Sequence, residues 1–250
     1  WHSSLAGGFV NVWFTDSWLG QRYGTFPLDL NFLILRWLEF PLSLNLLFSV
    51  TLFIAASGMY LLLRTLRLNA PACFVGGTGN LLTNTVVTLV FPGHATKVMT
   101  CAWIPFSIAF FIRALQNQKL RDFAVSGAFL GLALLGGEVQ VPYYLGLWFT
   151  AWTLLFLWNQ WRLRLLTPRA AVTHGTGLFL VALCALVLGF TTTFHSLNYL
   201  GGNTLASAAE PEKNWLFATQ FYFPPEEVLS YLTTVQFFGG PDVYWGRDGN

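Results

Sequence analysis

The sequence predicts an all-α protein, a polytopic membrane helix bundle with about six transmembrane helices. Of its 250 residues, 54% are hydrophobic and only 10% are charged. A soluble domain carries about 25% charged residues, and a disordered chain combines low hydrophobicity with high charge, so neither class fits. The net charge of +2 is too small to indicate a nucleic-acid partner. The class that remains is an integral membrane protein in contact with membrane lipids.

Long runs without Asp, Glu, Lys or Arg place the helices, because a membrane span needs about 20 mostly apolar residues. These runs predict helices near 43–64, 72–91, 98–115, 122–137, 142–160 and 174–196. The third and fourth helices become long enough if Arg113 and Asp122 extend to the interface. Pro105 lies inside the third helix and predicts a kink.

Basic residues predict the orientation, because loops rich in Lys and Arg stay in the cytoplasm. Eight of the 13 basic residues fall in three short loops on one side: Arg64, Arg67, Arg113, Lys119, Arg121, Arg162, Arg164 and Arg169. Asp122 is the one acid of 11 expected on that side. The inner side therefore carries +7, and the outer side, with five basic and ten acidic residues, carries −5.

Three regions follow from this topology. Residues 1–42 form an outer-face loop, 43–196 form the six-helix transmembrane region, and 197–250 form a second outer-face loop that we expect to continue into further helices. In the first loop, the apolar stretch 28–38 predicts a short interfacial helix, with a loop of scattered aromatic residues as the alternative. The chain begins at Trp1, and we expect it to be an internal piece of a longer protein.

Glu138 is the strongest candidate for function, because an ionisable residue at a membrane helix end needs an explanation. It follows Gly136 and Gly137, which permit a close backbone approach or a break, and it is followed by Gln140. Glu138 is predicted to act as a base, a metal ligand or a substrate contact. The alternative is an interfacial carboxylate that caps a turn.

Further candidates lie in the outer loops. His94 and Lys97 come directly before the third helix and could hold a phosphate, since Lys supplies a point charge and His can donate a hydrogen bond. The alternative is an ordinary helix start with its Lys at the interface. Asp16 and Asp29 could serve acid/base or metal chemistry, although a loop Asp more often caps a turn. The sequence contains no GxSxG, HExxH or P-loop pattern.

Several short stretches occur in a characteristic order: GMYLLLR at 58–64, PGH at 92–94, AWIP at 102–105, GLALLGGEVQ at 131–140, YY at 143–144, FPPEE at 223–227, QFFGG at 236–240 and YWG at 244–246. Over roughly residues 1–247, this order resembles the bacterial YfhO-like membrane proteins. That family is related to the GT-C glycosyltransferases, which use polyprenyl-phosphate sugars on the outer face of the membrane. Many relatives have a His after the corresponding glycine and then Pro-Gln, whereas this chain has Glu138-Val139-Gln140.

The resemblance implies a GT-C-like fold in the bacterial cytoplasmic membrane and a lipid-linked-sugar-dependent glycosyltransferase, with or without a divalent cation. On this hypothesis two residues are catalytic, Asp16 and Glu138, and four bind substrate, His94, Lys97, Gln140 and Asp29. The second hypothesis is a non-catalytic subunit of a larger photosynthetic or respiratory membrane complex. Its 11 Trp and 24 Phe would then provide contact surfaces for other membrane subunits.

Overall fold

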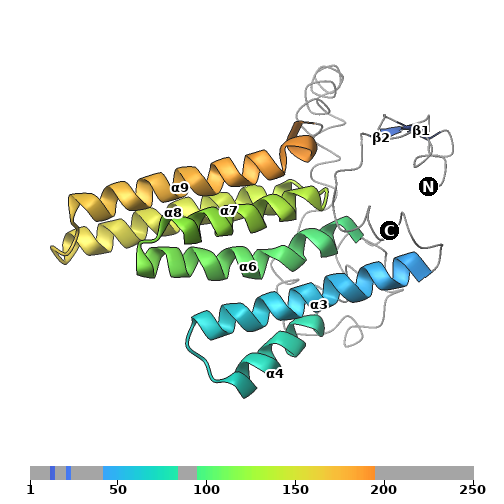
Figure 1. Cartoon of the computed structure of the whole chain (residues 1–250), viewed down its shortest axis with the longest axis horizontal. Coiled ribbons are helices and arrows are strands. Elements are labelled where there is room, and N and C mark those ends of the chain that lie inside the picture. The colour runs from blue at the N-terminus through green and yellow to red at the C-terminus, as the bar shows by residue number, and fades with distance from the viewer. Residues whose placement is uncertain (1–11, 15–20, 24–41, 84–94, 195–250) are drawn as a thin grey trace, which may run out of the picture.

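A computed structural model describes residues 12–14, 21–23, 42–83 and 95–194 of the chain. Its helices are α3 (Leu42–Thr65), α4 (Ala70–Leu81), α6 (Ala95–Asn117), α7 (Leu120–Leu135), α8 (Gln140–Arg162) and α9 (Pro168–Leu188). Two three-residue strands, β1 (Val12–Phe14) and β2 (Gln21–Tyr23), pair antiparallel in the first predicted loop. The predicted all-α bundle is confirmed (Figure 1). The expected interfacial helix at 28–38 lies outside the described residues.

Four of the described helices are long and apolar enough to cross a membrane: Asn45–Thr65, Thr96–Asn117, Gln140–Arg162 and Pro168–Leu188. The other two are too short to span on their own, because α7 has 16 residues and α4 has 12. Within the described residues there are thus four full spans, where the sequence predicts about six across the chain.

The helix predicted at 72–91 differs most from the structure, because α4 begins at Ala70 and ends at Leu81. Two carbonyls of its last turn accept hydrogen bonds from the residues that directly follow the helix. The Leu82 amide donates to the Gly79 carbonyl at 3.0 Å, and the Thr83 hydroxyl donates to the Asn80 carbonyl at 2.9 Å. These i to i+3 bonds satisfy carbonyls that have no partner at a helix end. Residues 84–94 lie outside the described part.

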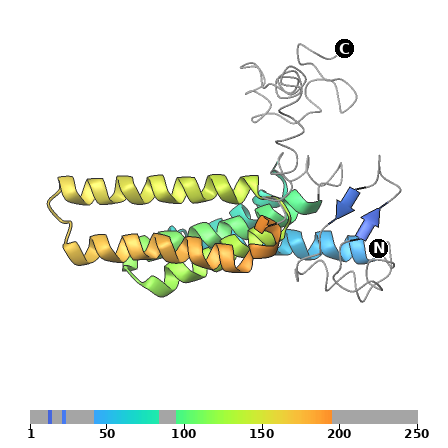
Figure 2. The same ribbon diagram turned by 90° about the horizontal axis from the view of Figure 1, so that it is seen from above.

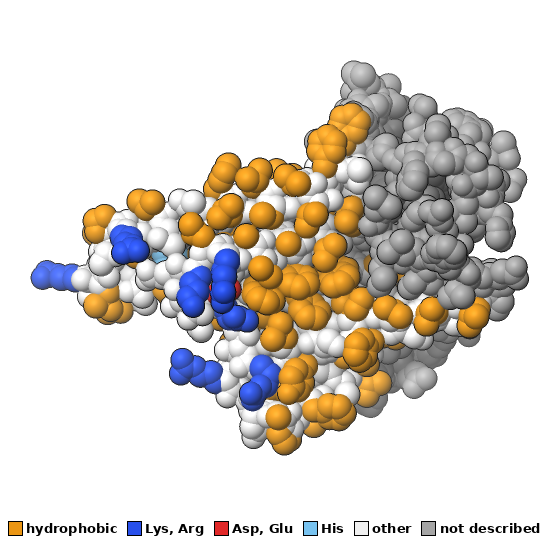
Figure 3. Space-filling model, viewed as in Figure 1, with side chains coloured by type: hydrophobic (Ala, Val, Ile, Leu, Met, Phe, Trp, Pro, Cys, Tyr) orange, Lys and Arg blue, Asp and Glu red, His pale blue; other side chains and the backbone are white. Residues whose placement is uncertain are grey.

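Five helices form a row in the order α4, α3, α6, α7, α9, with each packed on the next. Helix α8 lies on one side of this row (Figure 2). The turns after α3, α6 and α8 all lie at the same end, on the left of Figure 1. These turns and the adjoining helix ends carry the eight basic residues predicted to be cytoplasmic, and we call this the basic end of the bundle (Figure 3).

Helix α7 packs through small residues on both sides. On the α6 side, Ser107 and Ser126 bond reciprocally: each hydroxyl donates to the other residue's backbone carbonyl, at 2.9 and 2.8 Å. On the α9 side, a Cβ added at Gly127 would lie 2.5 Å from the Val181 carbonyl oxygen, and one at Gly131 would lie 3.1 Å from that of Ala185. Glycines four residues apart let membrane helices approach this closely.

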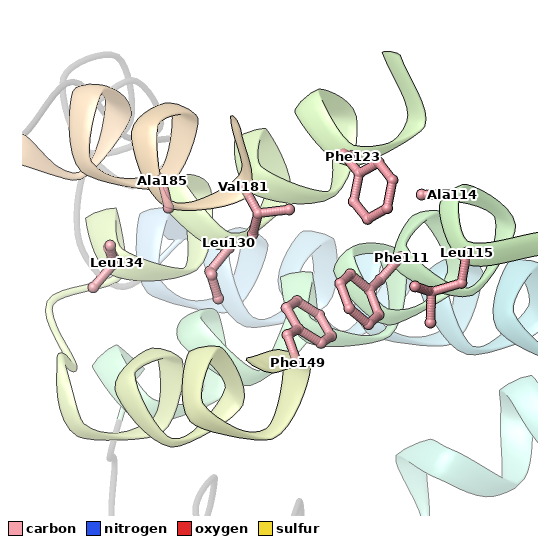
Figure 4. Packing of buried hydrophobic residues seen from close by; sticks show 9 residues of the cluster. All are labelled: Phe111, Ala114, Leu115, Phe123, Leu130, Leu134, Phe149, Val181 and Ala185. Carbon is pink, nitrogen blue, oxygen red and sulfur yellow. The ribbon is translucent and has the colours of Figure 1, made fainter. Parts of the chain in front are cut away.

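Helix α8 instead joins the bundle through aromatic rings. Phe149 stacks on Phe111 of α6, with centroids 3.9 Å apart and planes 13° apart. Both rings are fully buried in a cluster that Leu130 of α7 and Val181 of α9 complete (Figure 4). One stacked pair therefore anchors α8 to the row.

Candidate functional site

The turn between α7 and α8 owes its shape to two consecutive glycines. A Cβ at Gly136 would lie 2.6 Å from the Thr100 hydroxyl oxygen and 2.9 Å from the Thr100 backbone nitrogen, so only glycine allows this approach to α6. Gly137 has φ +94°, a conformation that L side chains rarely adopt. The buried Thr100 hydroxyl donates to the Ala133 carbonyl at 3.0 Å and holds α7 to α6 at this level.

Glu138 follows these glycines and caps the turn that leads into α8, whose own N-cap residue, Val139, makes no side-chain hydrogen bond. Its Oε1 accepts a hydrogen bond from the Gln140 backbone N–H at 3.3 Å. A carboxylate at a helix N-terminus also interacts favourably with the partial positive charge of that terminus. The side chain is only partly buried. The cap, the simpler of the two predicted roles, is therefore present, and it engages one of the two carboxylate oxygens.

Lys97 lies at the start of α6 with an exposed side chain. One turn further along the same helix is Cys101, which is half-buried. A Cβ at Gly137 would lie 3.5 Å from Cγ2 of Thr96, so the turn that carries Glu138 contacts the turn of α6 that carries Lys97, 41 positions earlier in the sequence. We call this group, Lys97, Cys101 and Glu138 with Gln140 beside it, the Lys97–Glu138 junction.

The structure brings together three of the six predicted site residues, Lys97, Glu138 and Gln140. They lie at the end opposite the basic end, as the predicted topology requires. Asp16, Asp29 and His94 lie outside the described residues. Within the described ranges, no group of three or more His, Cys, Asp or Glu is placed to hold a metal ion.

Two buried ionisable residues lie nearer the basic end. Asp122, in the first turn of α7, is 2% exposed, and its Oδ1 lies 3.6 Å from Nε of Arg121. The sequence suggests that Asp122 extends to the interface, whereas the structure buries it. His174 is 1% exposed, and its ring meets the rings of Phe123 and Phe156 edge-on. Neither His174 nitrogen has a hydrogen-bond partner among the described atoms.

Sequence reasoning gave no role to the serine pair or to the glycine positions of α7. The spacing of Gly127 and Gly131 is the signal that could have found the α9 contact, because it is the small-xxx-small pattern of membrane helix pairs. The Ser107–Ser126 pair carries no comparable signal, since its partners come from different helices.

Comparisons with protein-family models, with curated proteins and with solved structures find no match to this chain. The YfhO-like resemblance therefore rests on the ordered motifs of the sequence. The geometry described above is the basis for any functional proposal.

Proposed function

We propose that this chain is the membrane-embedded core of a glycosyltransferase-like enzyme that takes a polyprenyl-phosphate-linked sugar at the Lys97–Glu138 junction. The observation that carries the proposal is the contact between the turn that carries Glu138 and the start of α6, which carries Lys97, at the end opposite the basic end. A cation and a carboxylate at the end of a membrane bundle are the two charges that transfer from a phosphate-linked donor requires.

Each residue has a distinct role in this reaction. The acceptor hydroxyl oxygen forms a bond to the anomeric carbon, the bond from that carbon to the phosphate oxygen breaks, and polyprenyl phosphate leaves. Lys97 neutralises the charge that develops on the leaving phosphate. Glu138 uses the oxygen not engaged in the α8 cap to accept the acceptor's proton as general base. Gln140 provides polar contacts to the sugar, and we propose that His94, Asp16 and Asp29 complete the site.

The test uses the full chain in nanodiscs, with polyprenyl phosphate for binding and a panel of polyprenyl-phosphate hexoses for release of polyprenyl phosphate. We expect Lys97→Gln to weaken binding of polyprenyl phosphate at least tenfold, because hydrogen bonds to charged groups contribute about 1.5–3 kcal/mol. Lys97→Arg should keep most of the binding. If Lys97→Gln binds as the unmodified protein does, the proposal is wrong.

Variants of Glu138 separate its structural role as a cap from its proposed role as a general base. Glu138→Gln keeps an oxygen that can accept from the Gln140 N–H, so the α8 cap and the fold should persist while release of polyprenyl phosphate falls at least a hundredfold. Glu138→Ala removes both the cap and the base and should also lower the melting temperature. Equal release by Glu138→Gln and the unmodified protein would exclude a general base at this position.

A second candidate function is a non-catalytic subunit of a larger membrane assembly. The observation that favours it is the outer side of α8, where Tyr143, Trp148, Trp158 and Trp161 are all exposed. Such rings suit contacts with partner helices as well as with lipid. The donor experiment separates the two functions, because a packing subunit should neither bind polyprenyl phosphate through Lys97 nor release it.

A further inference from the structure

Two turns at the basic end share the same sequence and backbone. Leu66-Arg67-Leu68 follows α3, and Leu163-Arg164-Leu165 follows α8. Arg67 has φ 67° and Arg164 has φ 56°, both in the left-handed region. In both cases the next helix starts with a side-chain cap and an early proline, Asn69 accepting from the Ala72 amide and Thr167 from the Ala170 amide. The two helix pairs therefore end in the same kind of tip.

Both tips expose apolar and basic side chains together. The exposed fractions of the flanking leucines are Leu66 49%, Leu68 37%, Leu163 56% and Leu165 63%. Arg67 and Arg164 are themselves exposed. Glycine adopts a left-handed φ without steric penalty, yet arginine occupies both positions. Each arginine therefore lies between two partly exposed leucines, and this combination of cationic and apolar groups suits a surface that is both apolar and anionic.

The charges around the tips favour an anion. Lys119 lies in the third turn of this end, between α6 and α7, and Arg121 lies in the first turn of α7. Asp122 is the acid that the described part of the chain places here, and it is buried and close to Arg121. The surface of the basic end thus keeps its positive charge (Figure 3). This inference does not depend on the proposed transfer reaction.

We propose that the two Leu-Arg-Leu tips bind the headgroups of anionic phospholipids in the leaflet at the basic end. The arginines contact the lipid phosphates, and the leucines enter the boundary between headgroups and acyl chains, where exposed apolar side chains are stable. The leucines distinguish this occupant from free phosphate, which offers them no apolar contact. Basic residues at a membrane surface attract anionic lipids over neutral ones.

The test places the full chain in nanodiscs of equimolar phosphatidylcholine and phosphatidylglycerol, and native mass spectrometry measures which lipid stays bound. The unmodified protein should retain phosphatidylglycerol preferentially. We expect the ratio of phosphatidylglycerol to phosphatidylcholine to fall about fivefold for each arginine removed in Arg67→Gln and Arg164→Gln. Gln118→Gly, at a left-handed position (φ 55°) in the third turn of the same end, removes no charge and should leave the ratio unchanged.

A second pair of variants distinguishes a loss of lipid binding from a loss of the fold. Arg67→Gly and Arg164→Gly suit the left-handed backbone, so the melting temperature should be kept or raised while the lipid preference falls as in the glutamine variants. Leu66→Ser with Leu165→Ser should also lower phosphatidylglycerol retention with every charge intact. The proposal is overturned if the unmodified protein retains both lipids equally, if the arginine variants keep the preference, or if excess inorganic phosphate displaces the bound lipid completely.

Discussion

Helices α7 and α8 are neighbours in the sequence, yet the bundle uses them in opposite ways. Helix α7 is too short to span a membrane and is packed on two sides, against α6 and α9. Helix α8 is long enough to span, but only 17% of its most apolar window is buried, against 61% for α6. Position in the bundle therefore follows from small and hydroxyl-bearing side chains, and not from hydrophobicity, because lipid solvates an apolar helix as well as another helix does.

The largest difference in stability between variants of α7 and α8 is expected when a glycine of each helix gains one methyl group. Gly127→Ala places a Cβ against the Val181 backbone, which cannot move without separating α7 from α9. We expect the free energy of unfolding in micelles to fall by about 3 kcal/mol or more, the upper part of the range for overpacking. The control is Gly146→Ala in α8, where nothing lies within 4 Å and stability should not fall. Equal losses in both variants would contradict the central role of α7.

The next largest effect should come from the stacked ring pair that joins α8 to α6. Phe149→Ala removes the ring stacked on Phe111 and leaves a cavity between α8 and the row. Burial of a ring this large predicts a loss of about 3 kcal/mol, the lower end of the range for Phe→Ala, because α8 has room to close the gap. Leu154→Ala on the exposed side of α8 should change stability by less than about 0.5 kcal/mol. Thermal unfolding in one detergent compares the two, and similar losses would mean that α8 is covered on both sides.

The smallest expected loss of stability concerns the hydrogen bonds between α7 and α6. Ser107→Ala and Ser126→Ala each remove one of the two reciprocal hydrogen bonds, at a cost of about 0.6–1.7 kcal/mol each, as found for hydrogen bonds between membrane helices. A double-mutant cycle should show coupling between the two residues, because their hydroxyl oxygens also lie 3.3 Å apart. Thr150→Ala in α8 removes an exposed bond to the Gly146 carbonyl and should be nearly neutral. Strict additivity of the serine variants would argue against the paired arrangement.

Charge-free runs located the spans well because charges mark where an apolar helix leaves the membrane. The helix predicted at 43–64 is Leu42–Thr65, and the one predicted at 142–160 is Gln140–Arg162. The last helix was placed too late, at 174–196, because Arg169 interrupts the apolar run. In the structure this helix begins at Pro168, because the Thr167 side chain caps its first turn. The charge of Arg169 does not prevent the helix from starting there.

The site was predictable residue by residue but not as a group. Glu138 beside two glycines stood out in the sequence, and so did Lys97 at a helix start. The approach of the turns that carry them depends on how α7 is aligned along α6, and contacts such as that of Gly136 with Thr100 set this alignment. Side-chain spacing within one helix carries no information about alignment between helices. For the same reason the burial of Asp122 was missed.

The two-residue connection between α6 and α7 has a consequence for how the chain enters the membrane. Helix α7 is about 24 Å long at 1.5 Å per residue, less than the roughly 30 Å hydrocarbon core. Because Gln118 and Lys119 alone separate it from α6, α7 can be carried in as the second arm of a hairpin. The insertion of α7 then requires that α6 has already entered the membrane. The order in which the two helices are synthesised therefore contributes to the fold.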